Sequence, residues 1–460
     1  MTHLDDTARG LTIGTRLGNA SRTHRTKTQT MGSFMRTTHP RRDSALLASI
    51  VAVATVLPAA AAASPSHATD AAVAASAPSQ QARPVIMRSK PKVHEITLEV
   101  ELYAGASTTP AFSGDNAVDL RPAYSIPQIK IGVPVLTRTT WCDTDFSALA
   151  WKVENDGYDI TRRDAKVFSQ VKPGVEAMLE FDVVPRTELF NGMRVLAKYR
   201  VQRWEVTVDE AAAARVTWPR EWPAWTKRHL GEELGINPED PAIKSLAENA
   251  TRGGARSVTP FIAARNAVGA VLREWRSMTG DTSEFGPDGN LRGIRFTVGT
   301  ASGLGAGRGT SVELATTCVA ALRALGIPSR IVYGIEEHEN RSGREKTRFR
   351  YIGEFFLPEV GWIPFDPMEL RGQGAATKPS TAPVKGFANV TNLEKVIPLS
   401  FTPVPEGYSK ADRYAVWGWQ LLRGGQIRED RAFTRLRFEQ TSRGLGEVGS
   451  MPAPVNDVAE

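Results

Sequence analysis

The chain has 460 residues, of which 41% are hydrophobic, 8% aromatic and 23% charged, so we expect two or three globular domains. This balance excludes wholesale disorder, collagen-like repeats and a multi-span membrane protein. The net charge of +7 is concentrated in residues 1–68, which hold 8 basic and 3 acidic residues and leave 49 basic against 47 acidic in the rest. The rest of the chain is nearly neutral and lacks the excess of positive charge that binds phosphates, so we expect no nucleic-acid partner.

The first 68 residues contain the parts of a secretory leader. Arg41 and Arg42 precede thirteen mostly apolar residues, 45–57, and an alanine tract then leads to small residues ending at Ala68. A positive start, a short apolar segment and a small-residue exit are typical of a cleaved signal peptide. The sequence therefore predicts an extracytoplasmic protein, periplasmic or secreted, with cleavage near Ala68.

A retained membrane anchor is the alternative interpretation of the same segment. The apolar run extended to Ala63 has only nineteen residues, nine of them Ala, with Pro58 inside it. Because alanine contributes little to membrane insertion, we expect a membrane contact only if the leader is retained. Residues 1–34 match no part of a signal, so translation is expected to start at Met35 or Met31.

Residues 69–89 are rich in Ala, Ser, Pro and Gln, a composition that predicts a flexible tether. Residues 90–210 then show alternating apolar and polar positions, with Pro and Gly between the alternating stretches. Alternation places one face of each strand in a core and the other in water. We therefore expect residues 90–210 to form an antiparallel β-rich N-terminal domain.

A connection rich in Trp and Pro, residues 211–240, comes after the β-rich domain. It carries Trp218, Trp222 and Trp225. Large aromatic rings beside a domain boundary favour inter-domain packing, with sugar stacking as the alternative.

From residue 241 the pattern becomes helical. Asp240 followed by Pro241 is typical of a helix cap, and residues 261–277 repeat apolar positions at helical spacing. A further helix is predicted from 311, because Thr310 and Glu313 form a capping box. Its apolar stripe is made of Ala315, Cys318, Val319, Leu322 and Leu325.

Short strands are predicted after that helix. Residues 331–333 and 349–358 have strand character, with a charged loop over 336–346 between them, and the sequence GWIPFDP comes next at 361–367. The sequences ALRALGIPSR, EFFLPEVGW and IPFDP therefore occur in this order over residues 321–367.

In these motifs the chain resembles the transglutaminase-like superfamily, in its bacterial exported type. The resemblance covers roughly residues 241–370 and implies a papain-like cysteine-enzyme core. The expected fold is thus α+β, with this core over 241–372, the β-rich domain before it and a short β extension after it.

The resemblance also implies where a catalytic triad would lie. The family's cysteine opens the helix twelve residues before the first Arg of ALRALGIPSR, which is the position of Ser311. Its histidine lies four residues before the Glu of EFF, which is the position of Arg350, and its aspartate corresponds to Asp366. A helix start lowers the pKa of a thiol, a histidine accepts the proton and an aspartate orients the imidazole.

Two of these three positions are replaced, with Ser311 in the place of the cysteine and Arg350 in the place of the histidine. Arg350 cannot be a general base because its guanidinium stays protonated, and we expect it to form an ion pair with Asp366 instead. Cys318 lies seven residues after Ser311 on the apolar stripe and is expected to be a buried hydrophobe. His338, in the predicted loop, could serve Ser311 only if that loop folded back.

Cofactors and disulfides are not expected. Beyond the leader only His94, His229 and His338 remain, and there is no CxxC or Cys/His cluster, so a zinc site is not predicted. Cys142 and Cys318 fall in different predicted domains, although an exported chain could join them.

Residues 373–450 are predicted to be a β-containing C-terminal extension, and 451–460 a disordered tail. Segments 412–421 and 432–442 have strand character and are expected to pair as a hairpin. Trp417 and Trp419 share one face, which favours packing against the core over ligand stacking.

The sequence therefore favours an exported pseudoenzyme that binds a peptide or a cell-envelope polymer in the old cleft, or scaffolds a partner. The cleft is expected where Ser311, Arg350 and Asp366 meet, with Trp362 nearby. The alternative is an active protease-like hydrolase or acyltransferase in which Ser311 is the nucleophile.

Overall fold

The structure is a computed structural model. It describes residues 84–103, 126–163, 165–172, 176–186, 192–252, 254–279, 293–295, 300–339, 345–378, 381–403, 414–425, 433–442 and 451–452. The expected leader over 1–68 and residues 69–83 of the expected tether lie outside these ranges. Within these ranges, no helix combines the length and apolar character that crossing a membrane requires.

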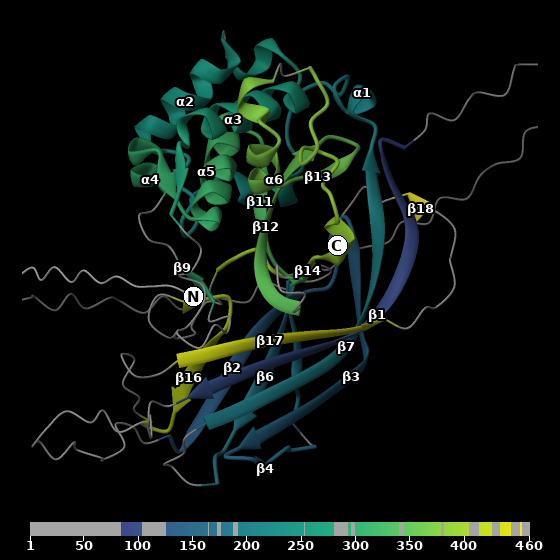
Figure 1. Ribbon diagram of the computed structural model, residues 1–460, viewed down its shortest axis with the longest axis vertical. Coiled ribbons are helices and arrows are strands. Elements are labelled where there is room, and N and C mark those ends of the chain that lie inside the picture. Colours follow the sequence, from purple (N-terminus) through teal and green to yellow (C-terminus); the bar gives the residue numbers. More distant parts are fainter. Residues whose placement is uncertain are drawn as a thin grey trace, which may run out of the picture. The chain divides into compact units, whose positions relative to one another are not determined.

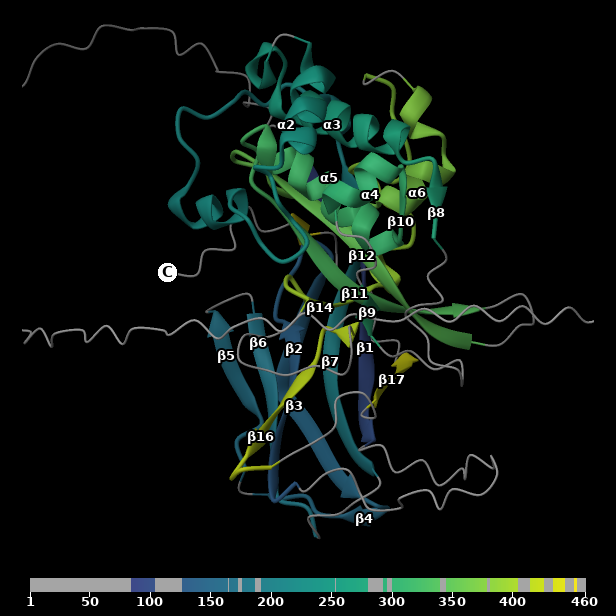
Figure 2. The same ribbon diagram turned by 90° about the vertical axis from the view of Figure 1, so that its left-hand side faces the viewer.

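Two antiparallel sheets build the β-rich part of the chain (Figure 2). The larger sheet consists of β1 (Ile86–Tyr103), β3 (Cys142–Asn155), β4 (Tyr158–Asp159), β7 (Gly192–Val208), β17 (Phe433–Ser442) and β18 (Met451–Pro452). The other consists of β2 (Gln128–Leu136), β5 (Phe168–Lys172), β6 (Glu176–Val183) and β16 (Gly418–Leu422). Trp151 on β3 meets Phe181 on β6 with ring centroids 6.1 Å apart, so side chains of the two sheets share one core.

Strands from the C-terminal part complete both sheets, which corrects the predicted hairpin. β17 pairs with β1, whereas β16 pairs with β2 in the other sheet. Each segment had the alternation of a strand, but alternation does not specify which strand is the partner. Strand β1 also begins at Ile86, inside the expected tether, and β18 lies inside the expected disordered tail. The predicted packing of Trp417 and Trp419 is confirmed, since both are buried and Trp417 stacks on Phe349.

A third sheet lies in the transglutaminase-like part of the chain. Its order is β13 (Gly361–Phe365), β12 (Glu345–Leu357), β11 (Ser329–Glu339) and β14 (Ile397–Ser400), all antiparallel. Two short pairs accompany it, β8 (Ser277–Met278) with β10 (Arg308–Gly309) and β9 (Ile294–Arg295) with β15 (Tyr414–Ala415). The strands β11 and β12 extend well into the predicted charged loop, so only residues 340–344 separate them.

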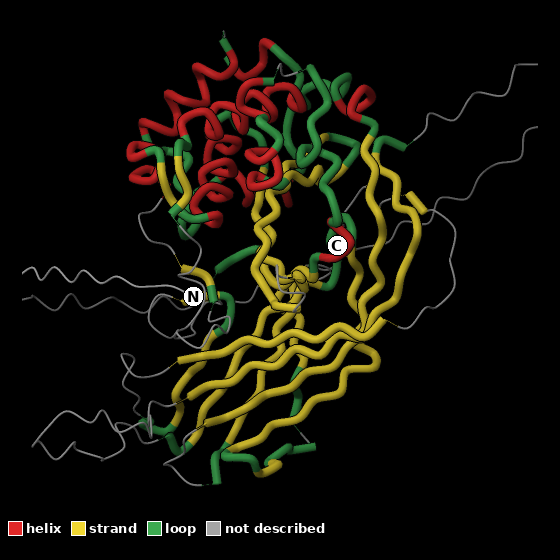
Figure 3. The backbone as a smooth tube through the Cα atoms, in the orientation of Figure 1, coloured by secondary structure: helices red, strands yellow, loops and turns green. Residues whose placement is uncertain are grey.

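Helices gather around this third sheet, as the red segments of Figure 3 show. They are α1 (Glu210–Ala213), α2 (Pro241–Thr251), α3 (Pro260–Glu274), α4 (Thr300–Ala306), α5 (Ser311–Ala324) and α6 (Pro367–Gly372). Short 3-10 turns occur at η1 (Ala224–Leu230), η2 (Ala255–Ser257), η4 (Ala375–Thr377) and η5 (Leu393–Lys395). Asp240 caps α2 as predicted, because its side chain accepts from the amides of Ala242 and Ile243.

Helix α5 is buried on all sides rather than along one stripe (Figure 1). It contacts α2, α3, α4 and α6 as well as β11 and β12. Its polar residues are therefore satisfied internally: Thr316 and Thr317 donate to the Glu313 carbonyl at 3.2 and 2.6 Å. An amphipathic pattern predicts a half-exposed helix, and this central helix differs because short hydroxyl residues can be buried when they bond to their own backbone.

The Trp-rich connection packs on the core sheet, which fits the packing interpretation of its rings. The ring centroids of Trp222 and Trp225 lie 6.3 and 5.1 Å from that of Phe356, and Trp225 also meets Trp362 at 6.2 Å. The indole of Trp222 donates to the Gly326 carbonyl at 2.8 Å. These contacts tie residues before α2 to the end of α5 and to β12.

Both cysteines should resist thiol reagents in the native state. Cys142 and Cys318 are free and fully buried, and burial raises the pKa of Cys142 to about 12 and that of Cys318 further. Because the thiolate is the reactive form, we expect labelling of both only after the chain unfolds. Spectrophotometric thiol titration with and without denaturant measures this, and fast native labelling of Cys318 would contradict its position inside α5.

The strand that carries Arg350 should not tolerate a methyl group at Gly353. A Cβ added there would lie 2.1 Å from the Phe365 ring, whereas one at Gly372 would meet nothing within 4 Å. We expect Gly353→Ala to lower the free energy of unfolding by about 1–3 kcal/mol through overpacking, and Gly372→Ala to change it far less. Urea denaturation of the two variants tests this, and equal midpoints would contradict the packing described.

Candidate functional site

The start of α5 is a tightly capped helix end. The Thr310 amide donates to a Glu313 carboxylate oxygen at 2.8 Å, and the Glu313 amide donates to the Thr310 hydroxyl at 3.4 Å, which confirms the capping box. Thr310 and Glu313 are both buried. Gly309 is required just before the cap, because an added Cβ would lie 2.5 Å from the Trp275 ring.

Ser311 is the first residue of this helix, at the position where the resemblance places the family's nucleophile. The residue is only 6% exposed. Helix α5 contacts β12, which carries Arg350, and α6, which begins directly after Asp366. The fold thus preserves a helix start at the expected position, with a hydroxyl in place of a thiol.

Arg350 lies on β12, in register with Gly334 of β11. Its Nε donates to Asp366 at 2.8 Å, which is the ion pair expected from the sequence. Its Nη1 donates to Glu336 at 3.1 Å, and a further carboxylate, Glu369, lies 3.8 Å from Nη2. The histidine position therefore holds a cation surrounded by three carboxylates.

Two backbone carbonyls complete the surroundings of Arg350. Nη2 donates to the Thr391 carbonyl at 2.8 Å and Nη1 to the Asn392 carbonyl at 3.3 Å. The segment that supplies them is held in turn by Glu369, which accepts from the Thr391 amide at 3.0 Å and from its hydroxyl. As a result the Arg350 side chain is only 13% exposed.

The carboxylate of Asp366 makes two sets of hydrogen bonds. One carboxylate oxygen accepts from Arg350, while the other accepts from the amides of Met368 and Glu369 at 2.8 and 3.1 Å. The second set of bonds caps α6, which begins with Pro367. The carboxylate is therefore fully engaged without an imidazole to orient.

The charges around Arg350 keep it protonated. Burial lowers its pKa, but the negative charges of Asp366 and Glu336 outweigh that effect, and the pKa lies above its ordinary value. A guanidinium in this setting cannot accept a proton from Ser311. Arg350 therefore cannot serve as the general base that the resemblance implies at its position.

His338 does not lie in a loop, which corrects that expectation. It belongs to β11 and pairs in register with Lys346, four residues along the strand from Gly334. At about 3.3 Å per residue, this places its backbone roughly 13 Å along the strand from the histidine position. A Ser311–His338 pair would require this segment to fold back as a loop, but the segment is a strand.

Trp362 is not an open wall of a cleft. It is 5% exposed, and the guanidinium of Arg330 lies 3.9 Å from its ring centroid, with the Phe401 ring centroid also 3.9 Å from Arg330. Arg330 in turn bonds to Glu354 at 2.7 Å, and both are buried. Trp362, which was expected beside the triad positions, thus packs against a second buried ion pair farther along the sheet.

Glu336, Glu369 and the carbonyls of 391–392 are members of the site that sequence reasoning missed. Glu336 was assigned to a charged loop, so its position on a strand beside Arg350 could not be read. Glu369 lies nineteen residues after Arg350 and residues 391–392 more than forty after it, so both join the site through tertiary contacts. Asp366 and Glu369 at helical spacing after Gly-Trp were the only local signal.

Within the residues that the structure describes, no group of three or more His, Cys, Asp or Glu side chains could hold a metal ion. The carboxylates around Arg350 are occupied by guanidinium nitrogens and backbone amides. What the arrangement can do is hold strands, helix α6 and the 391–392 segment together.

Comparison with known proteins agrees with this fold. Residues 296–367 match the family model of the transglutaminase-like superfamily, a span that includes Ser311, Arg350 and Asp366. No curated protein sequence matches the chain. A candidate cysteine protease from Cytophaga hutchinsonii shares 10% identity over 79% of this chain and 95% of its own, with a TM-score of 0.42.

A candidate protease from Parabacteroides distasonis shares 14% identity over 65% of this chain and 63% of its own, with a TM-score of 0.20. Because these structural scores are low, the family match and the geometry of α5, β12 and β13 carry the assignment. The mixed α+β fold expected from the sequence is confirmed, and the chain carries a domain of the transglutaminase-like superfamily.

Proposed function

We propose that the chain is an exported pseudoenzyme whose transglutaminase-like domain binds a peptide or a cell-envelope polymer, or scaffolds a partner, without thiol chemistry. Export rests on the leader, with its paired arginines, apolar run and small-residue exit before Ala68. The loss of chemistry rests on the triad positions. Fold membership alone does not settle activity, because activity depends on the residues at the site.

The observation that carries the proposal is the environment of Arg350. An arginine at the histidine position could be accidental if it pointed into solvent, but this one makes four hydrogen bonds to fixed acceptors. Three carboxylates, from β11, from α6 and from the residue that caps α6, converge on it together with two carbonyls. Such a set of partners indicates that the position serves structure.

The same geometry argues against a ligand at the triad position itself. Ser311, Arg350 and Asp366 are all largely buried, and the 391–392 carbonyls lie over the guanidinium. A peptide would have to displace a segment that Glu369 and Arg350 both hold. Binding is therefore expected at another surface of the domain.

Removal of Arg350 should destabilise the chain, since it leaves the buried Asp366 without its cation and takes away one of the two arginines that contact Glu336. We expect Arg350→Met to lower the free energy of unfolding by about 1–3 kcal/mol, through the desolvation of unpaired carboxylates. Arg348→Met is the matched control, because Arg348 also contacts Glu336 but is 47% exposed, and its loss should cost about 1 kcal/mol or less.

A double-mutant cycle separates this pair from general disruption. Asp366→Asn keeps a side chain that can cap α6, so the combination with Arg350→Met should cost clearly less than the sum of the two single changes. Urea denaturation measures all four chains. Strict additivity would mean that the ion pair contributes nothing and that Arg350 is held for another reason.

Purified wild-type chain should not turn over amide or ester substrates, and Ser311 should not react with a serine-directed phosphonate. The physical reason is that Arg350, at the position where the resemblance places the family's histidine, stays protonated and cannot take a proton from a serine hydroxyl. Ser311→Ala should therefore behave as wild type in amidase, peptidase and transamidase assays. The rival serine hydrolase predicts turnover that Ser311→Ala abolishes while the chain stays folded.

The double change Ser311→Cys with Arg350→His restores a thiol and an imidazole in family order. We expect at most weak thiol reactivity from it, because Glu336, Glu369 and the oxyanion donors are not arranged for catalysis. Robust hydrolysis by this variant would show that the rest of the machinery is intact, and the loss of function would then be confined to two residues.

A further inference from the structure

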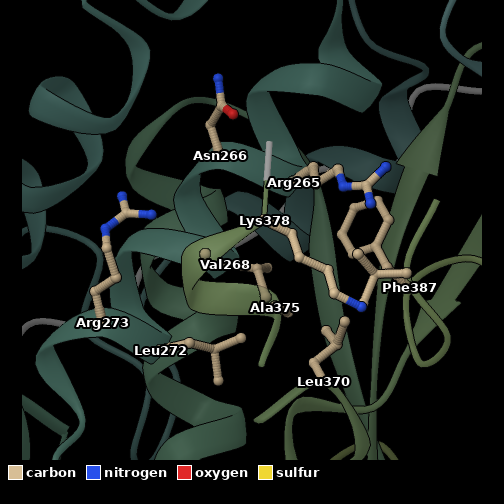
Figure 4. Close-up of a pocket in the computed structure, with 11 residues that line it drawn as sticks. Arg265, Asn266, Val268, Leu272, Arg273, Leu370, Ala375, Lys378 and Phe387 are labelled. Carbon is tan, nitrogen blue, oxygen red and sulfur yellow. The ribbon is translucent and has the colours of Figure 1, made fainter. Parts of the chain in front are cut away.

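A narrow pocket lies between α3, α6 and the η4 turn, away from Arg350 and Asp366. Figure 4 shows its lining, which includes Arg265, Asn266 and Arg273 from α3, together with Leu370 and Lys378 from later in the chain. It encloses about 370 Å³ of empty space including its open mouth, of which about 40 Å³ is wide enough for water. This pocket is called the Arg265 pocket below.

Arg265 brings an incompletely bonded charge to this pocket. The residue is only 8% exposed, and its Nη1 reaches Glu210 at 3.4 Å, a long bond for an ion pair. Its Nη2 is buried and has no hydrogen-bond partner among the described residues. An unsatisfied buried donor is costly and uncommon, so it indicates an acceptor that the chain itself does not supply.

Further positive charge and apolar surface complete the pocket. Lys378 is exposed, and its side chain extends across the pocket so that its amine ends near Leu370 and Phe387 (Figure 4). Arg273 lies at the other side of the pocket, and its Nη1 donates to the Ala376 carbonyl at 3.3 Å. No carboxylate is among the described residues that line it, so the lining carries only positive charge.

The chemistry that fits is an anionic group on a small apolar body. A carboxylate would supply the acceptor that Arg265 Nη2 lacks, and charge-assisted bonds of this kind are the strong ones. Lys378 adds positive charge to the same lining. Leu272 and Leu370 offer an aliphatic wall for the apolar group that carries the carboxylate. Most of the apolar side chains of the lining are aliphatic, which suits a small aliphatic group.

We propose that the Arg265 pocket binds the C-terminal carboxylate of a peptide whose last residue is small and apolar. The choice of a peptide rests on the proposed binding function of the domain, whereas the anionic character rests on the pocket alone. The pocket would place the peptide on α3 and α6, outside the closed triad position.

Calorimetric titration of the full chain tests this with N-acetyl-alanyl-alanine and with the same dipeptide as its C-terminal amide. We expect the acid to bind at least about tenfold more tightly than the amide, because the amide cannot form the charge-assisted bonds. Inorganic phosphate is titrated separately. Phosphate that binds as tightly as the acid would overturn the peptide terminus in favour of a free anion site.

Lys378→Glu should weaken binding of the acid by about tenfold or more, since it replaces an attraction with a repulsion. Lys395→Glu is the matched control, an exposed lysine outside the pocket, and should bind as wild type does. Arg265→Lys keeps a charge beside Glu210 while it removes Nη2, and should also weaken binding. Wild-type affinity in Lys378→Glu, or equal affinity for acid and amide, would overturn the proposal.

Failure of the pocket proposal can be distinguished from failure of the proposed function. A Ser311→Ala chain should bind the acid as wild type does, because the pocket does not include the helix start. Turnover by wild type would contradict the pseudoenzyme and leave the pocket standing. Equal acid and amide binding would remove the pocket and leave the absence of turnover unaffected.

Discussion

The buried ion pair between Arg330 and Glu354 sets the frame on which the site depends. The two side chains meet at 2.7 Å, and the guanidinium lies between the rings of Trp362 and Phe401. The other oxygen of Glu354 accepts from Thr140, in the segment between β2 and β3. Because a buried charge without its partner costs several kcal/mol, strands β11 and β12 are held in one register.

That register determines which residues surround Arg350. Alternation along the strands places Arg350 on the same face of β12 as Glu354, and opposite Gly334. A Cβ at Gly334 would lie 2.4 Å from a Val396 methyl, so the glycine allows the 391–396 segment to approach the sheet. The carbonyls of Thr391 and Asn392 then reach Arg350, and the position becomes closed.

Local sequence signals were sufficient to predict the features that depend on motifs and short spacings. The capping box at Thr310, the Asp240 cap and the Arg350–Asp366 pair were predicted from motifs and spacing, and the structure contains all three. Strand partners could not be predicted, because β16 and β17 join different sheets through contacts far apart in the chain. The network around Arg350 was missed for the same reason, since Glu336 was assigned to a loop and residues 391–392 carry no motif.

The charge count at the closed position explains why a single substitution would not return it to the family's chemistry. Glu336, Asp366 and Glu369 face Arg350, and Arg348 supplies the other nearby cation. A neutral imidazole in place of the guanidinium would remove the cation from Asp366 and Glu369, leave Glu336 with the partly exposed Arg348, and deprive the 391–392 carbonyls of their donors. Carboxylates that cannot all be neutralised repel one another, so the residues around Arg350 are matched to a cation and would resist a base.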